Sequence, residues 1–189
     1  MTLPMFDWPP IYLVDASAFR SLHNCHGGCP PETEERFSQA EQDAIWGLLN
    51  HLGEDGRIRV VNQVFRELDG RCPSSHSRGK AIPNHRPEAR FDGLIRMYQE
   101  ITGKHDRMVR RMDAEPADPW ILAWARIMIS RGVKVVTEEL PLAEAKNNAA
   151  RRRKLHFGLP LPDLCDEYHV KWVSLDGLLS AEAPELLRD

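Results

Sequence analysis

The sequence contains no apolar stretch that approaches the length needed to cross a bilayer. Its N-terminus also lacks a basic segment followed by an apolar run and a small-residue cleavage site, which is the pattern of a secretion signal. We therefore expect no membrane association and a cytoplasmic location. The 189 residues carry a formal net charge of −3. This balance gives no global electrostatic reason to expect a nucleic-acid partner, so any such partner needs local basic patches.

Cysteine is scarce. Four cysteines beside many charged residues do not resemble a secreted disulfide framework, and cytosolic thiols normally stay reduced. Free thiols are therefore the default prediction. The alternative is a zinc site, because Cys and His positions gather in two segments. These positions are His23, Cys25, His26, Cys29, Cys72 and His76. Their spacing is not that of a standard zinc finger, which makes zinc the weaker prediction.

Glycine-rich phosphate-binding motifs are absent as well. Neither Gly-x-Gly-x-x-Gly nor Gly-x-x-x-x-Gly-Lys occurs, and those glycines are what lets a backbone approach phosphates. A Rossmann-like nucleotide-binding enzyme is therefore disfavoured. We find no internal repeat and no coiled-coil heptad pattern. The length suits one domain spanning residues 1–189.

Short apolar runs alternate with segments whose apolar residues have helical spacing. The runs predict strands at 11–15, 58–61, 133–136 and 170–175. The helical segments include 38–52, 88–102 and 118–130. Strands that alternate with helices predict an α/β fold, here a three-layer α/β/α domain around a mostly parallel sheet of about four to five strands. The stretches 22–37 and 70–87 contain many residues that break regular structure, and they predict loop insertions.

Four acidic residues stand where a predicted strand ends or a helix begins or continues. They are Asp15, Glu67, Asp118 and Glu139. The carboxyl ends of the strands in an open α/β sheet form one edge, so we expect these acids to meet there. Two carboxylates about 4 Å apart at an effective dielectric constant of about 20 repel by roughly 4 kcal/mol. Such a cluster takes up protons or holds cations, and a divalent metal site is the economical explanation.

The segments that carry these acids resemble the PIN domain, a metal-dependent ribonuclease fold that includes the VapC toxins. The motifs are Tyr12-Leu13-Val14-Asp15-Ala16-Ser17, Val64-Phe65-Arg66-Glu67-Leu68, Asp118-Pro119-Trp120-Ile121-Leu122-Ala123 and Val135-Val136-Thr137-Glu138-Glu139. A further stretch, Leu161-Pro162-Asp163-Leu164-Cys165, is similar to the Pro-Asp-x-Cys segment of an uncharacterised PIN-like subgroup. The resemblance covers most of the chain except the two predicted insertions.

The resemblance implies a set of metal ligands for Mg²⁺ or Mn²⁺. Carried over by position, they are Asp15, Glu67, Asp118 and Glu139, with Asp163 as a further candidate. Glu139 departs from the commoner Asp, and Glu138 beside it is an alternative at that position. Ser17 and Thr137 match small hydroxyl residues that accompany the acids in the family. Water bound to such a metal would supply the nucleophile.

The activity implied is hydrolysis of RNA phosphodiester bonds by an endoribonuclease, the toxin of a toxin–antitoxin pair. An antitoxin protein and a homodimer follow as expected partners. Positive flanks for RNA are available at 107–111 and 151–154 and at His85 and Arg86, although a basic run is usually only a solvated face. Trp120 and Trp124 are expected in the core.

Plainer explanations stand beside these. Asp118 precedes Pro119 and Asp163 follows Pro162, positions where an acid caps or opens a helix. The simpler interpretation of Glu67 is a solvent-exposed helix residue, because glutamate is usually exposed. A catalytically inactive PIN-like domain that binds RNA or a protein is the second hypothesis for the whole chain.

Overall fold

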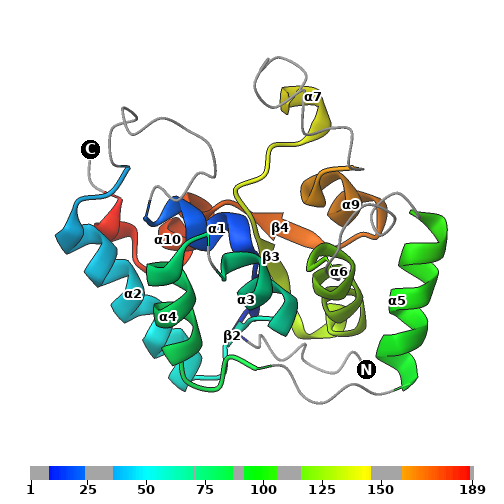
Figure 1. The fold of residues 1–189 in the computed structure, drawn as a ribbon, viewed down its shortest axis with the longest axis horizontal. Coiled ribbons are helices and arrows are strands. Elements are labelled where there is room, and N and C mark those ends of the chain that lie inside the picture. Colours follow the sequence, from blue (N-terminus) through cyan, green and yellow to red (C-terminus); the bar gives the residue numbers. More distant parts are fainter. Residues whose placement is uncertain are drawn as a thin grey trace, which may run out of the picture.

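A computed structural model describes residues 9–23, 36–69, 71–86, 92–105, 116–145 and 159–187. Within these residues, four parallel strands form one sheet in the order β2-β1-β3-β4 (Figure 1). The strands are β1 (Tyr12–Val14), β2 (Ile58–Arg59), β3 (Lys134–Val136) and β4 (Lys171–Val173). Tyr12 is paired with Ile58 on one side and with Lys134 on the other. The predicted parallel α/β fold is confirmed.

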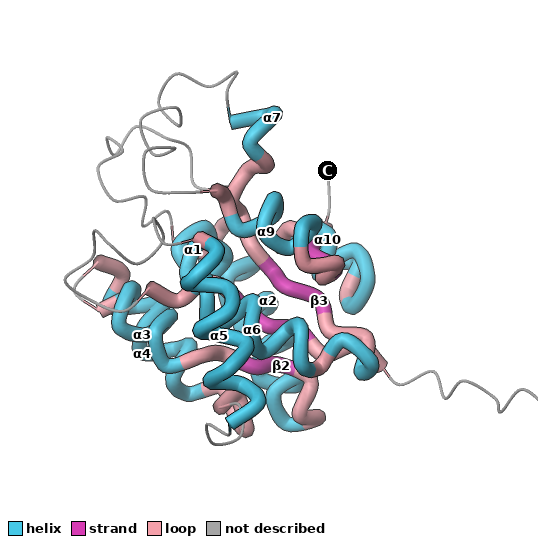
Figure 2. Tube along the Cα trace, turned by 90° about the vertical axis from the view of Figure 1, so that its right-hand side faces the viewer, coloured by secondary structure: helices cyan, strands magenta, loops and turns pink. Residues whose placement is uncertain are grey.

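Helices cover both faces of this sheet. They are α1 (Ala16–Ser21), α2 (Gln39–Glu54), α3 (Asn62–Leu68), α4 (Pro73–Ala81), α5 (Asp92–Lys104), α6 (Asp118–Ile127), α7 (Leu142–Ala145), α9 (Leu161–Glu167) and α10 (Leu175–Glu182). Short 3₁₀ turns form at η2 (Ile129–Arg131) and η4 (Pro184–Leu186). Helices α3 and α6 lie on one side of β3 and α10 lies on the other (Figure 2). The apolar runs form strands because a sheet covered on both faces buries every residue of a strand.

The core confirms the predicted apolar pattern. Leu13 and Val135 of the two central strands are fully buried, and Trp120 and Trp124 of α6 are buried as expected. Helix α5 packs against α6 and lies outside it (Figure 1). None of the helices in the described part of the chain is long and apolar enough to cross a membrane.

The helix boundaries follow local sequence signals. Ser38 and Glu41 form a capping box at the start of α2, because the Ser38 side chain accepts from the Glu41 backbone and the Glu41 carboxylate accepts from the Ser38 backbone N–H at 2.7 Å. Gly132 follows η2 with φ 67°, a left-handed conformation that costs glycine little. One predicted cap is wrong. Asp118 is the first residue inside α6, and its side chain caps nothing.

The stretch 70–87 is not the loop that its composition predicted, because residues 73–81 form α4. This helix has Pro73 at its start, and Ser75 and Gly79 face inward. Ser75 Oγ donates to the carbonyl of Phe19 at 2.7 Å, and a Cβ at Gly79 would lie 3.2 Å from the Phe65 ring. Small and polar residues do the packing here, so the helix lacks the apolar periodicity by which it could be found.

The prediction of free thiols is wrong for Cys72, which is disulfide-bonded to a partner outside the described residues. Cys165 is free and buried, as expected. The prediction failed because composition indicates only the redox compartment, whereas the fold decides which sulfur atoms come close together. The zinc alternative loses the Cys72 thiolate, and Cys25, His26 and Cys29 lie outside the described residues, as does most of the insertion predicted at 22–37.

Candidate active site

Asp15 stands at the carboxyl end of β1, where it is also the N-cap of α1. Its Oδ1 accepts from the Ala16 N–H at 2.6 Å, and its Oδ2 accepts from the Ser17 N–H at 3.1 Å and the Ser17 hydroxyl at 2.5 Å. The Asp15 N–H donates to the Val136 carbonyl, which continues the pairing of β1 with β3. The residue is only 3% exposed. Backbone donors and the sheet edge therefore fix the orientation of this carboxylate.

Two hydroxyl groups join the ends of β1 and β3. Ser17 Oγ and Thr137 Oγ1 are 3.1 Å apart, and Thr137 also donates to Asp15 Oδ2 at 3.3 Å. In turn, the Glu138 N–H donates to Ser17 and the Glu139 N–H to Thr137, at 2.9 and 3.2 Å. The segment after β3 is thereby held beside Asp15. These are the two hydroxyl residues that the sequence singled out.

Glu67 and Asp118 approach from the helices on the same side. Glu67 of α3 accepts from the N–H of Ala117, the N-cap of α6, at 2.8 Å, which ties α3 to the residue before Asp118. Burial raises the pKa of Glu67, and the charge of Asp15 raises it further. A solvated helix residue would show neither effect. Glu67 is therefore part of the acidic site.

Among the four acids, the carboxylate of Asp118 has the least compensation for its negative charge. Burial raises its pKa well above the ordinary value, and the charges of Glu139, Asp15 and Glu67 add to the rise. Its side chain has no hydrogen bond or ion pair with the residues that the structure describes. A half-buried acid in this state is stabilised by a proton or by a cation.

The two neighbouring glutamates after β3 separate into different environments. The Glu139 carboxylate accepts from the Leu161 N–H at the start of α9 at 2.8 Å, and burial followed by the charge of Asp15 raises its pKa to about 7. Glu138 instead binds Arg36 at 2.6 Å and accepts from the Leu175 N–H at 2.7 Å. Glu139 therefore faces the acids, and Glu138 caps α10.

Asp163 takes a structural part. Its Oδ2 accepts from the N–H of Leu142, the first residue of α7, at 2.8 Å. Its charge is not among the largest causes of the raised pKa values of Glu67, Asp118 and Glu139. The structure thus brings Asp15, Glu67, Asp118 and Glu139 together and gives Asp163 a contact outside that group.

The four acids match the ligand preference of a hard divalent cation, because they offer carboxylate oxygens that lack a balancing positive charge. Among the residues that the structure describes, no three Asp, Glu, His or Cys side chains stand as a ready set of ligands. Carboxylates without a cation repel one another, which favours separated side chains. The assignment of individual ligands accordingly stays a prediction.

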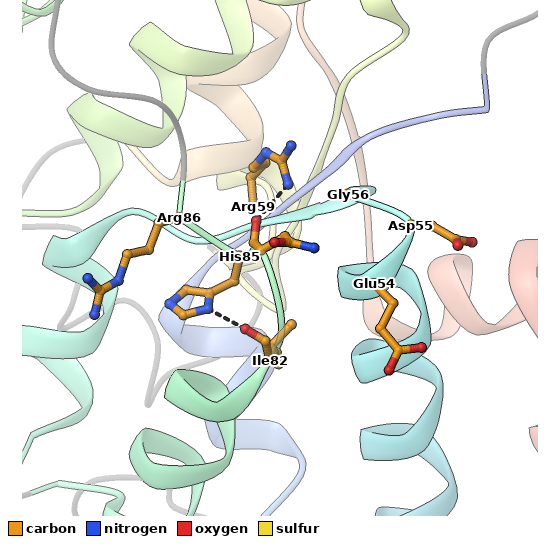
Figure 3. A pocket seen from close by; sticks show the side chains of 8 residues that line it. Glu54, Asp55, Gly56, Arg59, Ile82, His85 and Arg86 are labelled. Atoms are coloured by element: carbon orange, nitrogen blue, oxygen red, sulfur yellow. Dashed lines mark hydrogen bonds between the residues drawn. The ribbon is translucent and has the colours of Figure 1, made fainter.

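The predicted phosphate contacts His85 and Arg86 lie in a hollow of about 640 Å³ that none of the four acids lines (Figure 3). There the His85 ring contacts the Ile82 carbonyl, and Arg59 donates to the Asn84 carbonyl at 2.7 Å. The fold therefore assigns His85 and Arg86 to a different surface. The basic runs at 107–111 and 151–154 lie outside the described residues.

One residue of the site escaped sequence reasoning. Arg20 of α1 acts against the raised pKa values of Glu67, Asp118 and Glu139. Its position three residues after Ser17 was the available signal, because residues three apart share a face of a helix.

Comparison with known protein families assigns the chain. The pattern of the domain of unknown function DUF4411 matches residues 12–186. The chain belongs to this family. Comparisons with curated proteins and with solved structures found no match. The DUF4411 description names no activity, so the function is argued from the acidic site.

Proposed function

We propose that this DUF4411 protein is a divalent-metal-dependent ribonuclease of PIN-like type. The observation that carries the proposal is the state of Asp118, a half-buried carboxylate with no hydrogen-bond donor among the described residues and three acids close enough to raise its pKa. Keeping such a group charged is costly unless a cation binds. The parallel sheet and the order of the acids along the chain agree with the PIN-like resemblance.

The residues present suggest a division of roles. Asp15 and Asp118 would hold the metal directly, and Glu67 and Glu139 would hold a second ion or orient water. A bound Mg²⁺ or Mn²⁺ supplies a nucleophilic water at neutral pH and stabilises charge on the phosphate. Ser17 and Thr137 keep Asp15 in one orientation. Because its pKa is about 7, Glu139 is able to hold or release a proton near neutrality.

The test is cleavage of a pool of structured and unstructured RNAs by the purified chain in Mg²⁺, Mn²⁺ or EDTA. Asp15→Asn is the test variant, and Glu138→Gln is its matched control because Glu138 faces Arg36 instead of the acids. We expect cleavage that EDTA and Asp15→Asn abolish and that Glu138→Gln preserves. Metal-dependent cleavage that survives Asp15→Asn would contradict the proposed site.

A toxin role extends the proposal through the PIN-like resemblance. It predicts that expression of the chain arrests growth, that Asp15→Asn relieves the arrest, and that a cognate antitoxin protein restores growth. Arrest that is unchanged by Asp15→Asn would argue against a toxin acting through this site.

A non-catalytic domain that binds RNA or a protein is the second candidate. The observation in its favour is Glu139, which stands where the PIN-like resemblance has the commoner Asp and whose carboxylate accepts a hydrogen bond from the Leu161 N–H. RNA binding without cleavage in every metal would favour this candidate.

A further inference from the structure

Arg20 lies on the side of α1 that faces the acidic site. It follows Ser17 by three residues, so the two side chains share one face of the helix. Ser17 on that face donates to the Asp15 carboxylate at 2.5 Å. Arg20 itself is half-buried.

The charge of Arg20 reaches acids that come from three other segments. In Glu67, Asp118 and Glu139, burial raises the pKa, and the Arg20 guanidinium works against that rise. Arg20 is among the largest influences on all three acids, whereas Arg71 is among those on Glu67. Arg20 is therefore a positive charge common to the site.

The N–H donors of Arg20 are not taken up by these carboxylates. No ion pair or hydrogen bond joins its guanidinium to the residues that the structure describes. Other arginines of this chain behave differently: Arg36 binds both Glu138 and Asp176, and Arg57 binds Glu182. A guanidinium carries five donors in a planar fork, and none of those of Arg20 is bonded to a group in the described part of the chain.

We propose that Arg20 binds a backbone phosphate of the RNA strand held at the acidic site. The inference rests on the proposed ribonuclease function. Four carboxylates repel a polyanion, so the site needs a positive group that reaches the strand without neutralising the metal ligands. Arginine suits this task because its fork matches two phosphate oxygens at once, whereas lysine offers only a point charge.

RNA binding tests the proposal without relying on turnover. We would measure the affinity for a labelled single-stranded RNA in the inactive Asp15→Asn background, with Arg20→Gln, Arg20→Lys and the control Arg96→Gln, an exposed arginine of α5. Arg20→Gln should weaken binding about 10- to 100-fold, the range for hydrogen bonds to charged groups. Arg20→Lys should recover part of the loss, and Arg96→Gln should change little.

The affinity of the RNA-free Asp15-containing chain for Mn²⁺ separates this role from a structural one. Removing a positive charge beside the carboxylates should leave Mn²⁺ binding unchanged or tighter, so Arg20→Gln should affect RNA and metal differently. Equal losses of RNA and Mn²⁺ binding, or unchanged RNA affinity in folded Arg20→Gln, would overturn the proposal. Absence of cleavage by the wild-type chain would reject the ribonuclease function, while the RNA affinities would still decide the role of Arg20.

Discussion

Partly buried carboxylates at the two ends of β1 have pKa values that are shifted in opposite directions. At the amino end, Glu182 accepts from the Tyr12 hydroxyl at 2.6 Å and binds Arg57 at 2.5 Å. Burial opposes the ionisation of Glu182, but these partners outweigh it and lower its pKa. At the carboxyl end, Asp118 and Glu139 have raised pKa values because burial and neighbouring acids act together.

The two groups of carboxylates differ in whether the chain itself neutralises their charge. A structural carboxylate is neutralised by a partner within the chain, so nothing further needs to bind. The acidic site lacks such a partner and is destabilising until protons or cations arrive. Unneutralised charge concentrated at a sheet edge is typical of functional sites.

The largest expected effect comes from Asp118→Asn. RNA cleavage in Mn²⁺ should fall by more than about 100-fold, because even partners outside the first ligand shell cost 10- to 100-fold. Without metal, the melting temperature should stay level or rise by a few degrees, since an unbalanced, half-buried charge is removed. A cleavage assay in Mn²⁺ checks the first expectation, and calorimetry without metal checks the second. A melting temperature that drops in the metal-free protein would show that Asp118 is a structural acid like Glu182.

The second prediction uses pH to contrast Glu139 with Glu182. The folded chain holds the Glu139 proton up to a pKa of about 7, whereas the ordinary value is 4.5. Between these values the unfolded chain has already lost the proton, so metal-free stability should fall by roughly 3 kcal/mol as pH rises through this window. Glu182 has the opposite sign, because its pKa is lowered and its stabilisation is lost only as acid protonates it.

Urea unfolding from pH 4.5 to 8 measures this slope. Glu139→Gln should flatten it, and Glu138→Gln should leave it intact because Glu138 is paired with Arg36. Mn²⁺ should also flatten it, because metal binding displaces the proton. An equal slope in the metal-free wild type and in Glu139→Gln would refute the assignment.

The smallest effect is expected at the amino end of β1, where Arg57 neutralises Glu182. Glu182→Gln should destabilise the fold by about 1–3 kcal/mol, because Arg57 is left without its partner in a largely buried place. RNA cleavage per folded molecule should not change, since the substitution lies at the amino end of β1. Chemical unfolding and a cleavage assay on the same preparation give the two readings, and a selective loss of cleavage would break the comparison.

Much of this fold was predictable from the amino-acid pattern. Short apolar runs predicted the strands, because a parallel sheet covered by helices buries every strand residue. Asp15 was assigned to the site for the same reason: an acid directly after a buried strand must lie at the sheet edge. Helix α4 was missed because Ser75 and Gly79 pack it through small size and a hydrogen bond, which leaves no apolar period in the sequence.

The tertiary structure alone decided which of the candidate groups meet. Glu138 and Glu139 are chemically identical neighbours. Their backbone N–H groups donate to Ser17 and Thr137, and in the fold one side chain binds Arg36 while the other faces the acids. Asp163 looked like Asp118 in sequence but caps α7. Charge balance is a property of distances in space, so neither the unbalanced Asp118 nor the reach of Arg20 could be known before the chain was folded.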